Sequence, residues 1–489
     1  MDLVLERRSL NPATIVAVAL LIGAAAALAV AVASASPMLM IAACVIAIGA
    51  GLVARSVDWA TYGVLFCLYA NLAVVAVRFH GVPVLAAHAV VALLGLPLAY
   101  YILVRRQSVV VGPCFPWLAM FAVVQGLGVV FADQPARAAE EFFTFLIEAV
   151  LLYSLIVNVI RSEQALRGAT WALCLAGILM GGFPLIQQIK GDFDNQYGGL
   201  AQTPEEPGFL GHDGSTIQRR MAGPIGEKNR YGQVMLMLIP LSLFRLRDER
   251  SPWLRALAVI TFTLAAAGVY LSFSRSTILC AGLVLLLAAA FQHVNRRFVT
   301  FGVIVAFCGL LLTPQYRARL ASLADLRELL SSGKHSQADG ALKGRATEMG
   351  AAALVFLDHP LVGVGPGEFK YYSREYGERI GIRALEPNRQ AHCLPLDVAA
   401  ENGVFGLICL LGVFSVQGWR LARQVNDPAI SRGLRGLSAG CLYMLAAYAT
   451  TGLFLHFAFI RYFWIMIALG DAAVLLGQSA KSRSQQDEA

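Results

Sequence analysis

Residues 390–418, QAHCLPLDVAAENGVFGLICLLGVFSVQG, contain the transition that decides the fold. The first residues are polar and close a long hydrophilic segment. Residues 397–418 then form an apolar run of about 22 residues, which is long enough to cross ~30 Å of hydrocarbon as a helix. Runs of this kind recur along the chain with short polar breaks between them, unlike the alternating strands of an outer-membrane barrel. The pattern predicts an all-α, polytopic membrane protein.

The overall composition supports the same fold class. The chain of 489 residues is 57% apolar and only 14% charged, and its mean hydropathy is +0.64. A water-soluble globule of this size needs more polar residues to cover its surface. We attribute the net charge of +8 to the excess of Lys and Arg that membrane proteins carry in their cytoplasmic loops. No nucleic-acid partner is therefore expected from the charge. The nine cysteines lie mostly in apolar runs and imply no disulfide framework.

Fourteen spans are expected, and because 38–54 and 276–292 are short and 276–292 closely follows its predecessor, the range is 12 to 14. They lie near residues 13–33, 38–54, 59–77, 84–104, 113–132, 140–160, 169–188, 230–247, 255–273, 276–292, 297–313, 397–418, 434–455 and 458–478. These spans divide the chain into N-terminal transmembrane helices (1–188), a first outer loop (189–229), central transmembrane helices (230–313), a large periplasmic loop (314–396), C-terminal transmembrane helices (397–478) and a disordered cytoplasmic tail (479–489).

The distribution of basic residues predicts the orientation. With the N-terminus inside, the inner segments hold nineteen Lys and Arg residues and the short outer connections hold four. Cytoplasmic loops carry this excess, so both termini are expected in the cytoplasm and both long loops on the outer side. Any chemistry in those loops then proceeds without cytoplasmic ATP or nucleotide sugars. In the larger loop, helical spacing predicts an amphipathic surface helix over 316–330 and a second helix over 343–358.

Arg220 leads a motif at the end of the first outer loop. It is followed by Gly223, Gly226 and Asn229, just before the span that starts at residue 230. Small residues beside a helix start let the backbone and a guanidinium approach an anion. The alternative is that the basic residues here extend to lipid headgroups as ordinary interfacial side chains.

Arg275 stands between two apolar runs with almost no loop around it. Ser274 and Ser276 flank it and form a polar notch at the expected membrane surface. An Arg near the membrane surface costs much less free energy than one at the bilayer centre, so a purely interfacial role is the alternative. We interpret the notch as functional.

His392 stands where the large loop re-enters the membrane, followed by Asp397 and Glu401. With an ordinary pKa near ~6.5, histidine is the side chain best suited to accept a proton from a hydroxyl at neutral pH. Asp397 or Glu401 is expected to orient or charge-stabilise it. A solvated loop histidine is the alternative.

Three further features of the sequence are weaker indications of a functional site. Asp192 and Asp194 resemble the acid pair that holds a divalent cation in some sugar transferases, or are simply loop residues. The run GVGPGEF lacks the spacing of a phosphate loop. Glu148 lies inside an apolar span, where an acid is a candidate for ion or substrate passage.

The order of these motifs resembles a known family. R-x-x-G-x-x-G-x-x-N at 220–229 is followed by S-x-S-R-S at 272–276, a Gly-Arg pair ahead of a helix, HPLVGVGPGEF at 359–369, and a His that opens a span with ENGVFGL. This resembles the O-antigen ligase and polysaccharide polymerase family of bacterial envelope enzymes, over roughly residues 215–415. The chain departs from the family pattern at Cys393, where Asn often follows the histidine, and at Ala400.

The resemblance implies a GT-C-type membrane glycosyltransferase at the outer face of the bacterial inner membrane. Its donor would be a glycan on undecaprenyl diphosphate. Its acceptor would be another lipid-linked repeat for a polymerase, or a sugar of lipid A core for a ligase. A chain-length regulator is a further expected partner, and no cofactor is expected.

The residues suit that chemistry. Displacement of diphosphate from an anomeric carbon passes through an oxocarbenium-like state, while negative charge grows on the leaving oxygen. Guanidinium groups suit this charge without a metal, and we expect Arg220, Arg275 and Arg345 to provide them. His392 would deprotonate the acceptor hydroxyl, and backside attack predicts inversion. Fourteen spans and the long outer loop favour a polymerase over a ligase. A glycolipid or anion transporter is the alternative from another class, with Glu148 as its support.

Overall fold

The computed structural model describes residues 57–204, 209–210, 216–321 and 340–487, so the expected spans 13–33 and 38–54 lie outside the described residues. The elements are α3 (Val57–Tyr69), α4 (Leu72–His80), α5 (Val84–Ala92), α6 (Gly95–Ala99), η1 (Tyr100–Val104), α7 (Phe115–Phe131), α8 (Pro135–Phe145), η2 (Leu146–Leu151), α9 (Leu152–Val159), α10 (Glu163–Lys190), η3 (Tyr197–Gly199), β1 (Phe209–Leu210), β2 (Thr216–Gln218), α11 (Lys228–Asp248), α12 (Pro252–Leu271), α13 (Arg275–Ala290), α14 (Arg296–Leu312), α15 (Pro314–Ala321), α17 (Gly340–Asp358), α18 (Phe369–Ile380), α19 (Leu394–Val425), α20 (Arg432–Gly452) and α21 (Ile460–Asp487). The short strands β1 and β2 pair antiparallel within the first expected outer loop.

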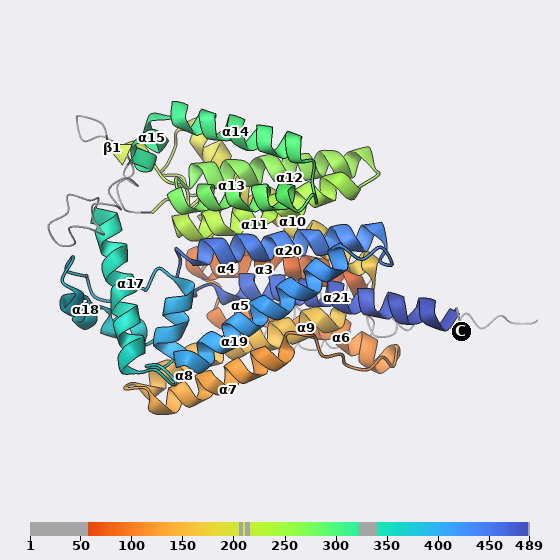
Figure 1. The fold of residues 1–489 in the computed structure, drawn as a ribbon, viewed down its shortest axis with the longest axis horizontal. Coiled ribbons are helices and arrows are strands. Elements are labelled where there is room, and N and C mark those ends of the chain that lie inside the picture. Colours follow the sequence, from red (N-terminus) through yellow and green to blue (C-terminus); the bar gives the residue numbers. More distant parts are fainter. Residues whose placement is uncertain (1–56, 205–208, 211–215, 322–339, 488–489) are drawn as a thin grey trace, which may run out of the picture.

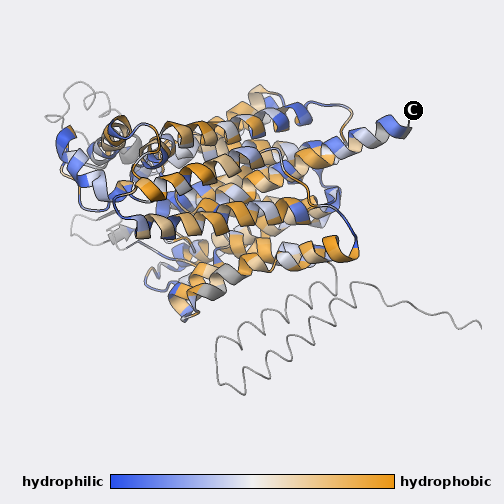
Figure 2. Cartoon of the chain, turned by 90° about the horizontal axis from the view of Figure 1, so that it is seen from below, coloured by the Kyte–Doolittle hydropathy of each residue, from blue (hydrophilic) through white to orange (hydrophobic). Residues whose placement is uncertain are grey.

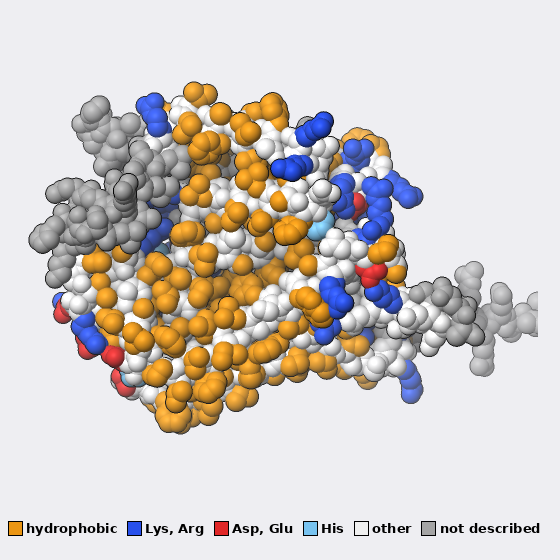
Figure 3. Space-filling view, viewed as in Figure 1, with side chains coloured by type: hydrophobic (Ala, Val, Ile, Leu, Met, Phe, Trp, Pro, Cys, Tyr) orange, Lys and Arg blue, Asp and Glu red, His pale blue; other side chains and the backbone are white. Residues whose placement is uncertain are grey.

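The long helices lie side by side in one bundle, which confirms the all-α membrane fold (Figure 1). Their apolar residues occupy the middle of the bundle and polar residues gather at its two ends (Figure 2). Among the described residues, five helices are long and apolar enough to cross a membrane: Pro135–Val159, Glu163–Lys190, Pro252–Leu271, Leu394–Val425 and Ile460–Ser482. The space-filling view shows a broad apolar surface with basic side chains at the end near the C-terminus (Figure 3).

One expected span, 59–77, is broken in the structure. α3 and α4 are bent by 56° about Asn71, which adopts a left-handed conformation with φ 61°. If the pair counts as one span, it is a sixth candidate within the described residues. The expected span 84–104 is likewise divided among α5, α6 and η1. An unbroken helix was expected because the apolar run continues through both breaks.

α11 forms the centre of the bundle. Sixteen of its 21 residues are buried, and it packs against α10, α12 and α20. The hydroxyl of Tyr69 on α3 donates to the carbonyl of Val234 on α11 at 3.0 Å. Small residues allow close crossings elsewhere, since a Cβ at Gly181 of α10 would lie 2.7 Å from the Leu264 carbonyl oxygen of α12.

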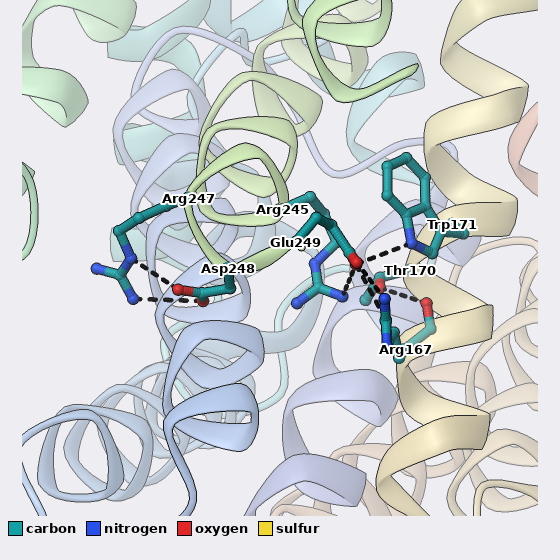
Figure 4. Close-up of polar contacts among 7 residues, drawn as sticks. All are labelled: Arg167, Thr170, Trp171, Arg245, Arg247, Asp248 and Glu249. Carbon is teal, nitrogen blue, oxygen red and sulfur yellow. Dashed lines mark hydrogen bonds and ion pairs between the residues drawn. The ribbon is translucent and has the colours of Figure 1, made fainter. Parts of the chain in front are cut away.

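A buried ion-pair cluster joins α10 to α11 at the basic end of the bundle (Figure 4). Glu249, just after α11, accepts hydrogen bonds from Arg245 Nη1 at 3.1 Å and Arg167 Nε at 3.0 Å. Trp171 Nε1 donates to the same carboxylate at 3.2 Å. Because Glu249 is only 6% exposed, its two arginines are what make its burial tolerable.

Candidate active site

α17 and α18 lie together at the end of the bundle opposite the C-terminus, and α17 runs across the direction of the long helices (Figure 1). α17 confirms the helix expected over 343–358. α15 covers the start of the surface helix expected over 316–330, and residues 322–330 lie outside the described residues. α17 packs against α19, so the large loop is docked on the bundle.

The glycine-rich segment HPLVGVGPGEF is held against a break in α19. Gly403 interrupts the helix with φ 63° and ψ −164°. The N–H groups of Val364 and Gly365 donate, each at 3.0 Å, to the carbonyls of Ala400 and Glu401 just before the break. The loop therefore joins α19 through main-chain hydrogen bonds.

This joint requires glycine on both sides. A Cβ at Gly363, where φ is 68°, would lie 2.3 Å from the Glu401 carbonyl carbon. A Cβ at Gly403 would lie 2.1 Å from the Leu361 carbonyl oxygen. The two backbones approach too closely for any side chain, so the glycines of the motif serve packing.

The two acids expected to support His392 hold backbone groups instead. Asp397, only 3% exposed, accepts a hydrogen bond from the Phe457 N–H at 2.8 Å. The Glu401 carboxylate accepts hydrogen bonds from the N–H groups of Gly367 and Phe369, where α18 begins. Asp397 thus positions the α20–α21 loop, and Glu401 positions α18.

His392 occupies a strained position just before α19, with φ 50°. Its side chain is 22% exposed, and Nδ1 lies 3.2 Å from the Gln390 carbonyl oxygen. A carbonyl can only accept, so this contact places a proton on Nδ1 and leaves the Nε2 lone pair for other partners. The neutral histidine is therefore held as the Nδ1–H tautomer, whose basic nitrogen is Nε2.

Glu348 of α17 is the acid beside His392, and sequence reasoning missed it. It is fully buried, and its Oε2 lies 3.5 Å from His392 Nδ1, while Oε1 accepts from Arg389 Nε at 2.7 Å. Burial lowers the pKa of His392, the Glu348 carboxylate opposes that shift, and Arg345 adds to it. Arg345 and Glu348 are three residues apart on one helix face, a spacing that was visible in the sequence.

Arg220 and Asn229 form one hydrogen-bonded unit. Arg220 donates through Nη2 to Asn229 Oδ1 at 3.0 Å and through Nε to the Ser272 carbonyl at 2.9 Å. Glu227 holds Asn229 in turn, accepting from its main-chain N–H at 2.9 Å. The first motif is thereby fixed to the S-x-S-R-S turn between α12 and α13.

The S-x-S-R-S turn is a buried cluster of hydroxyl groups at the start of α13. The hydroxyl of Thr277 donates to Ser274 Oγ at 3.0 Å, and Ser274 and Ser276 share a hydrogen bond at 3.3 Å. Arg275, half-buried, is the first residue of α13. Gly232 of α11 faces this cluster, since a Cβ there would lie 2.9 Å from Ser272 Oγ.

Arg230 and His456 connect the two halves of the site. Arg230, 2% exposed, donates to the His456 carbonyl at 2.6 Å and to Gln233 Oε1 at 2.7 Å. The ring of His456 lies 5.7 Å from that of His392, centroid to centroid. Because Arg230 directly follows Asn229, the Arg220 unit and the His392 unit meet at the start of α11. The sequence did not indicate these roles, since the contacts of His456 with Arg230 and with His392 join residues that are remote in the chain.

Glu148, the acid expected within a span, is paired. Its Oε1 accepts from Arg461 Nη1 of α21 at 2.9 Å. Arg461 also donates to Asn71 Oδ1, and Asn71 Nδ2 donates to the Pro224 carbonyl at 2.7 Å. The helix break at Asn71 is thus tied to the loop that carries Arg220.

The acid pair in the first loop lies on the surface. Asp194 is 91% exposed and forms an ion pair with Arg219 at 3.4 Å. Within the part of the chain that the structure describes, no group of three or more His, Cys, Asp or Glu side chains is arranged to hold a metal ion.

Residues 260–411 match the family model described as O-antigen ligase. This range is less than a third of the 489-residue chain; it includes Arg275, Arg345 and His392, whereas Arg220 and Asn229 precede it. No curated protein matches the sequence. The match confirms the resemblance that the order of motifs predicted, to a family of membrane enzymes of O-antigen and polysaccharide biosynthesis.

Proposed function

We propose that this chain, similar to O-antigen ligases over residues 260–411, is an inverting, metal-independent membrane glycosyltransferase of the bacterial inner membrane. It moves a glycan from undecaprenyl diphosphate to a sugar hydroxyl at the outer face. The observation that carries the proposal is the paired arrangement of His392 and Glu348 at the end of the bundle where both expected outer loops meet.

In the proposed reaction His392 Nε2 takes the proton of the acceptor hydroxyl. The acceptor oxygen then attacks the anomeric carbon of the donor sugar, and the bond from that carbon to the diphosphate oxygen breaks. The diphosphate leaves on its lipid carrier with the bonding electron pair. Because bond formation and departure occur on opposite faces, the configuration inverts. Positioned general-base catalysis of this kind contributes roughly 10²- to 10⁴-fold in rate.

Arg220, Arg275 and Arg345 are assigned to the diphosphate. Arg220 is fixed by Ser272 and Asn229, so its guanidinium is oriented before substrate arrives. Arg275 lies at the N-terminus of α13, where the helix dipole adds to its attraction for an anion. Preorganised donors of this type stabilise charge that develops in the transition state.

The acceptor defines two candidate functions. A polymerase, our first hypothesis, joins the glycan to another lipid-linked repeat. A ligase joins it to lipid A core, and the description of the matching family model favours this second candidate.

The test is the length profile of undecaprenyl-linked glycans in a strain that lacks the gene, complemented with wild type, His392→Ala or His359→Ala. His359 is an exposed histidine whose ring contacts Tyr372, so it serves as the matched control. Single repeats that accumulate on the carrier with His392→Ala identify a polymerase, and long chains stranded on the carrier identify a ligase. A profile unchanged by loss of the gene contradicts both and favours a transporter.

A further inference from the structure

A cavity of about 860 Å³ opens at the basic end of the bundle, between the C-terminal parts of α19 and α21. We call it the basic cavity, after the side chains of Trp419, Arg420, Arg423 and Lys481 that line it with Asp427. Arg420 lies 17 residues beyond the break of α19 at Gly403, which is about 26 Å along the helix at 1.5 Å per residue. The basic cavity lies at the end of the bundle near the C-terminus, and His392 lies beside α17 at the opposite end (Figure 1).

Asp427, the acid that lines the basic cavity, already has partners within the protein. Asp427 Oδ2 accepts from Lys481, and Oδ1 accepts from the Ala429 N–H at 3.0 Å. Within the described residues no carboxylate pairs with Arg420 or Arg423, and Arg420 Nε is buried without a hydrogen-bond partner. The buried carboxylate of Asp471, which acts electrostatically on Arg420, already accepts hydrogen bonds from Tyr153 and from the Cys114 N–H. Both guanidinium groups therefore keep N–H donors for an anion in the cavity.

The second arginine-lined cavity at this end is different. There Glu249 accepts hydrogen bonds from Arg167 and Arg245, and Asp248 pairs with Arg247 at 2.9 Å (Figure 4). Carboxylates of the protein pair with those three arginines, whereas Arg250 and Arg432, which also line this cavity, form no ion pair within the described residues. In the neighbouring cluster, acids pair directly with arginines, whereas in the basic cavity the lining acid Asp427 pairs with Lys481 and leaves Arg420 and Arg423 without a direct ion pair within the described residues.

The surroundings of the basic cavity favour a lipid over a soluble anion. Trp419 is 57% exposed beneath the guanidinium of Arg423, whose Cζ lies 4.7 Å from the ring centroid. Ile408 and Leu411, 45% and 50% exposed, continue the same face of α19 toward the middle of the membrane. An exposed Trp is typical of the headgroup level, and the apolar stripe offers a track for acyl chains.

We propose that the basic cavity binds the phosphate of an anionic phospholipid headgroup through Arg420 and Arg423, with the acyl chains along the Ile408–Trp419 face of α19. This site is independent of the proposed transferase chemistry. Phosphate suits guanidinium groups because each forms two parallel, charge-assisted hydrogen bonds.

The test uses the purified full chain in detergent, with native mass spectrometry to count retained lipids and the melting temperature as a second readout. Diphosphatidylglycerol and phosphatidylglycerol are expected to be retained and to raise the melting temperature, whereas phosphatidylcholine is not. Arg420→Gln with Arg423→Gln is expected to weaken retention roughly 10- to 30-fold. Arg250→Gln with Arg255→Gln removes two exposed arginines from the same end outside the basic cavity, and is expected to leave retention unchanged.

Three results would overturn the proposal. Equal loss of retention in both double variants would indicate general surface charge. Equal retention of phosphatidylcholine would indicate an apolar lipid site, and the same stabilisation by inorganic phosphate alone would indicate a soluble anion. If the Gln variants fold poorly, enrichment of anionic lipid on the wild-type chain from a mixed-lipid detergent extract decides the question, and no enrichment refutes the site.

Discussion

The Glu348 carboxylate lies 3.5 Å from Nδ1 of His392, although the two residues come from α17 and from the start of α19. The acid whose charge acts on the histidine is therefore supplied by the large loop, while the Gln390 carbonyl holds its Nδ1. Burial lowers the pKa of His392, and Glu348 limits that decrease while Arg345 and Arg389 deepen it. The position of α17 thus couples the docking of the loop to the basicity of the proposed catalytic group.

The first prediction concerns the pH dependence of the wild-type enzyme. Because burial lowers the pKa of His392 below its usual value, the imidazole stays neutral at pH 7 and the acid limb of kcat/KM lies below pH ~6.5. Transfer rates with a purified lipid-linked donor, measured from pH 5 to 8, check this. His392→Ala should lose roughly 10² to 10⁴ in rate and the acid limb with it. A limb that survives in His392→Ala would assign the titration to another group.

The second prediction distinguishes the effect of Glu348 on the pKa of His392 from that of Arg389. Glu348→Gln keeps the shape of the side chain but removes its negative charge, so the pKa of His392 should fall further and the acid limb should move to lower pH. Arg389→Gln removes a positive charge, so the limb should move to higher pH. We expect kcat to fall about 10-fold or more in Glu348→Gln with little change in KM, because the residue acts on the base through its charge and does not touch substrate.

Shifts of the limb in the same direction for Glu348→Gln and Arg389→Gln would show that both variants act by disturbing the fold. The melting temperature of each variant provides the independent check on folding.

The third prediction concerns the guanidinium of Arg220. Lysine keeps the charge but cannot donate to both Ser272 and Asn229, so Arg220→Lys should lower kcat/KM for the lipid-linked donor roughly 10- to 100-fold. Arg219→Lys is the control, because the ion pair of Arg219 is with the exposed carboxylate of Asp194, and this variant should stay within about twofold of wild type. Equal losses in the two variants would mean that this loop needs positive charge and no particular geometry.

Sequence patterns predicted the parts of the structure that depend on local spacing. The helix over 343–358 is set by its own residues, and α17 contains it. The break at Asn71 is set by the Pro224 carbonyl and by Arg461, which are far away in the chain, so the continuous apolar run of 59–77 concealed it. Glu348 and His456 could not be predicted from the sequence either, because their partner His392 is far away in the chain. Their contacts with His392 form only when α17 and the α20–α21 loop pack at the start of α19.

The final prediction tests the joint between the glycine-rich segment and α19. Gly403 has φ 63° and ψ −164°, a conformation that only glycine adopts easily, and a Cβ there would lie 2.1 Å from the Leu361 carbonyl oxygen. Gly403→Ala should therefore destabilise the protein by at least about 2 kcal/mol and abolish transfer, because the joint also fixes the start of α19 where His392 stands. Gly418→Ala in the same helix is the matched control, since its nearest contact would be Leu445 Cδ2 at an ordinary 3.8 Å. Alanine is favoured over glycine inside a helix, so this control should melt at or slightly above the wild-type temperature. A Gly403→Ala protein with wild-type melting temperature and activity would show that the loop is not clamped to α19 in this way.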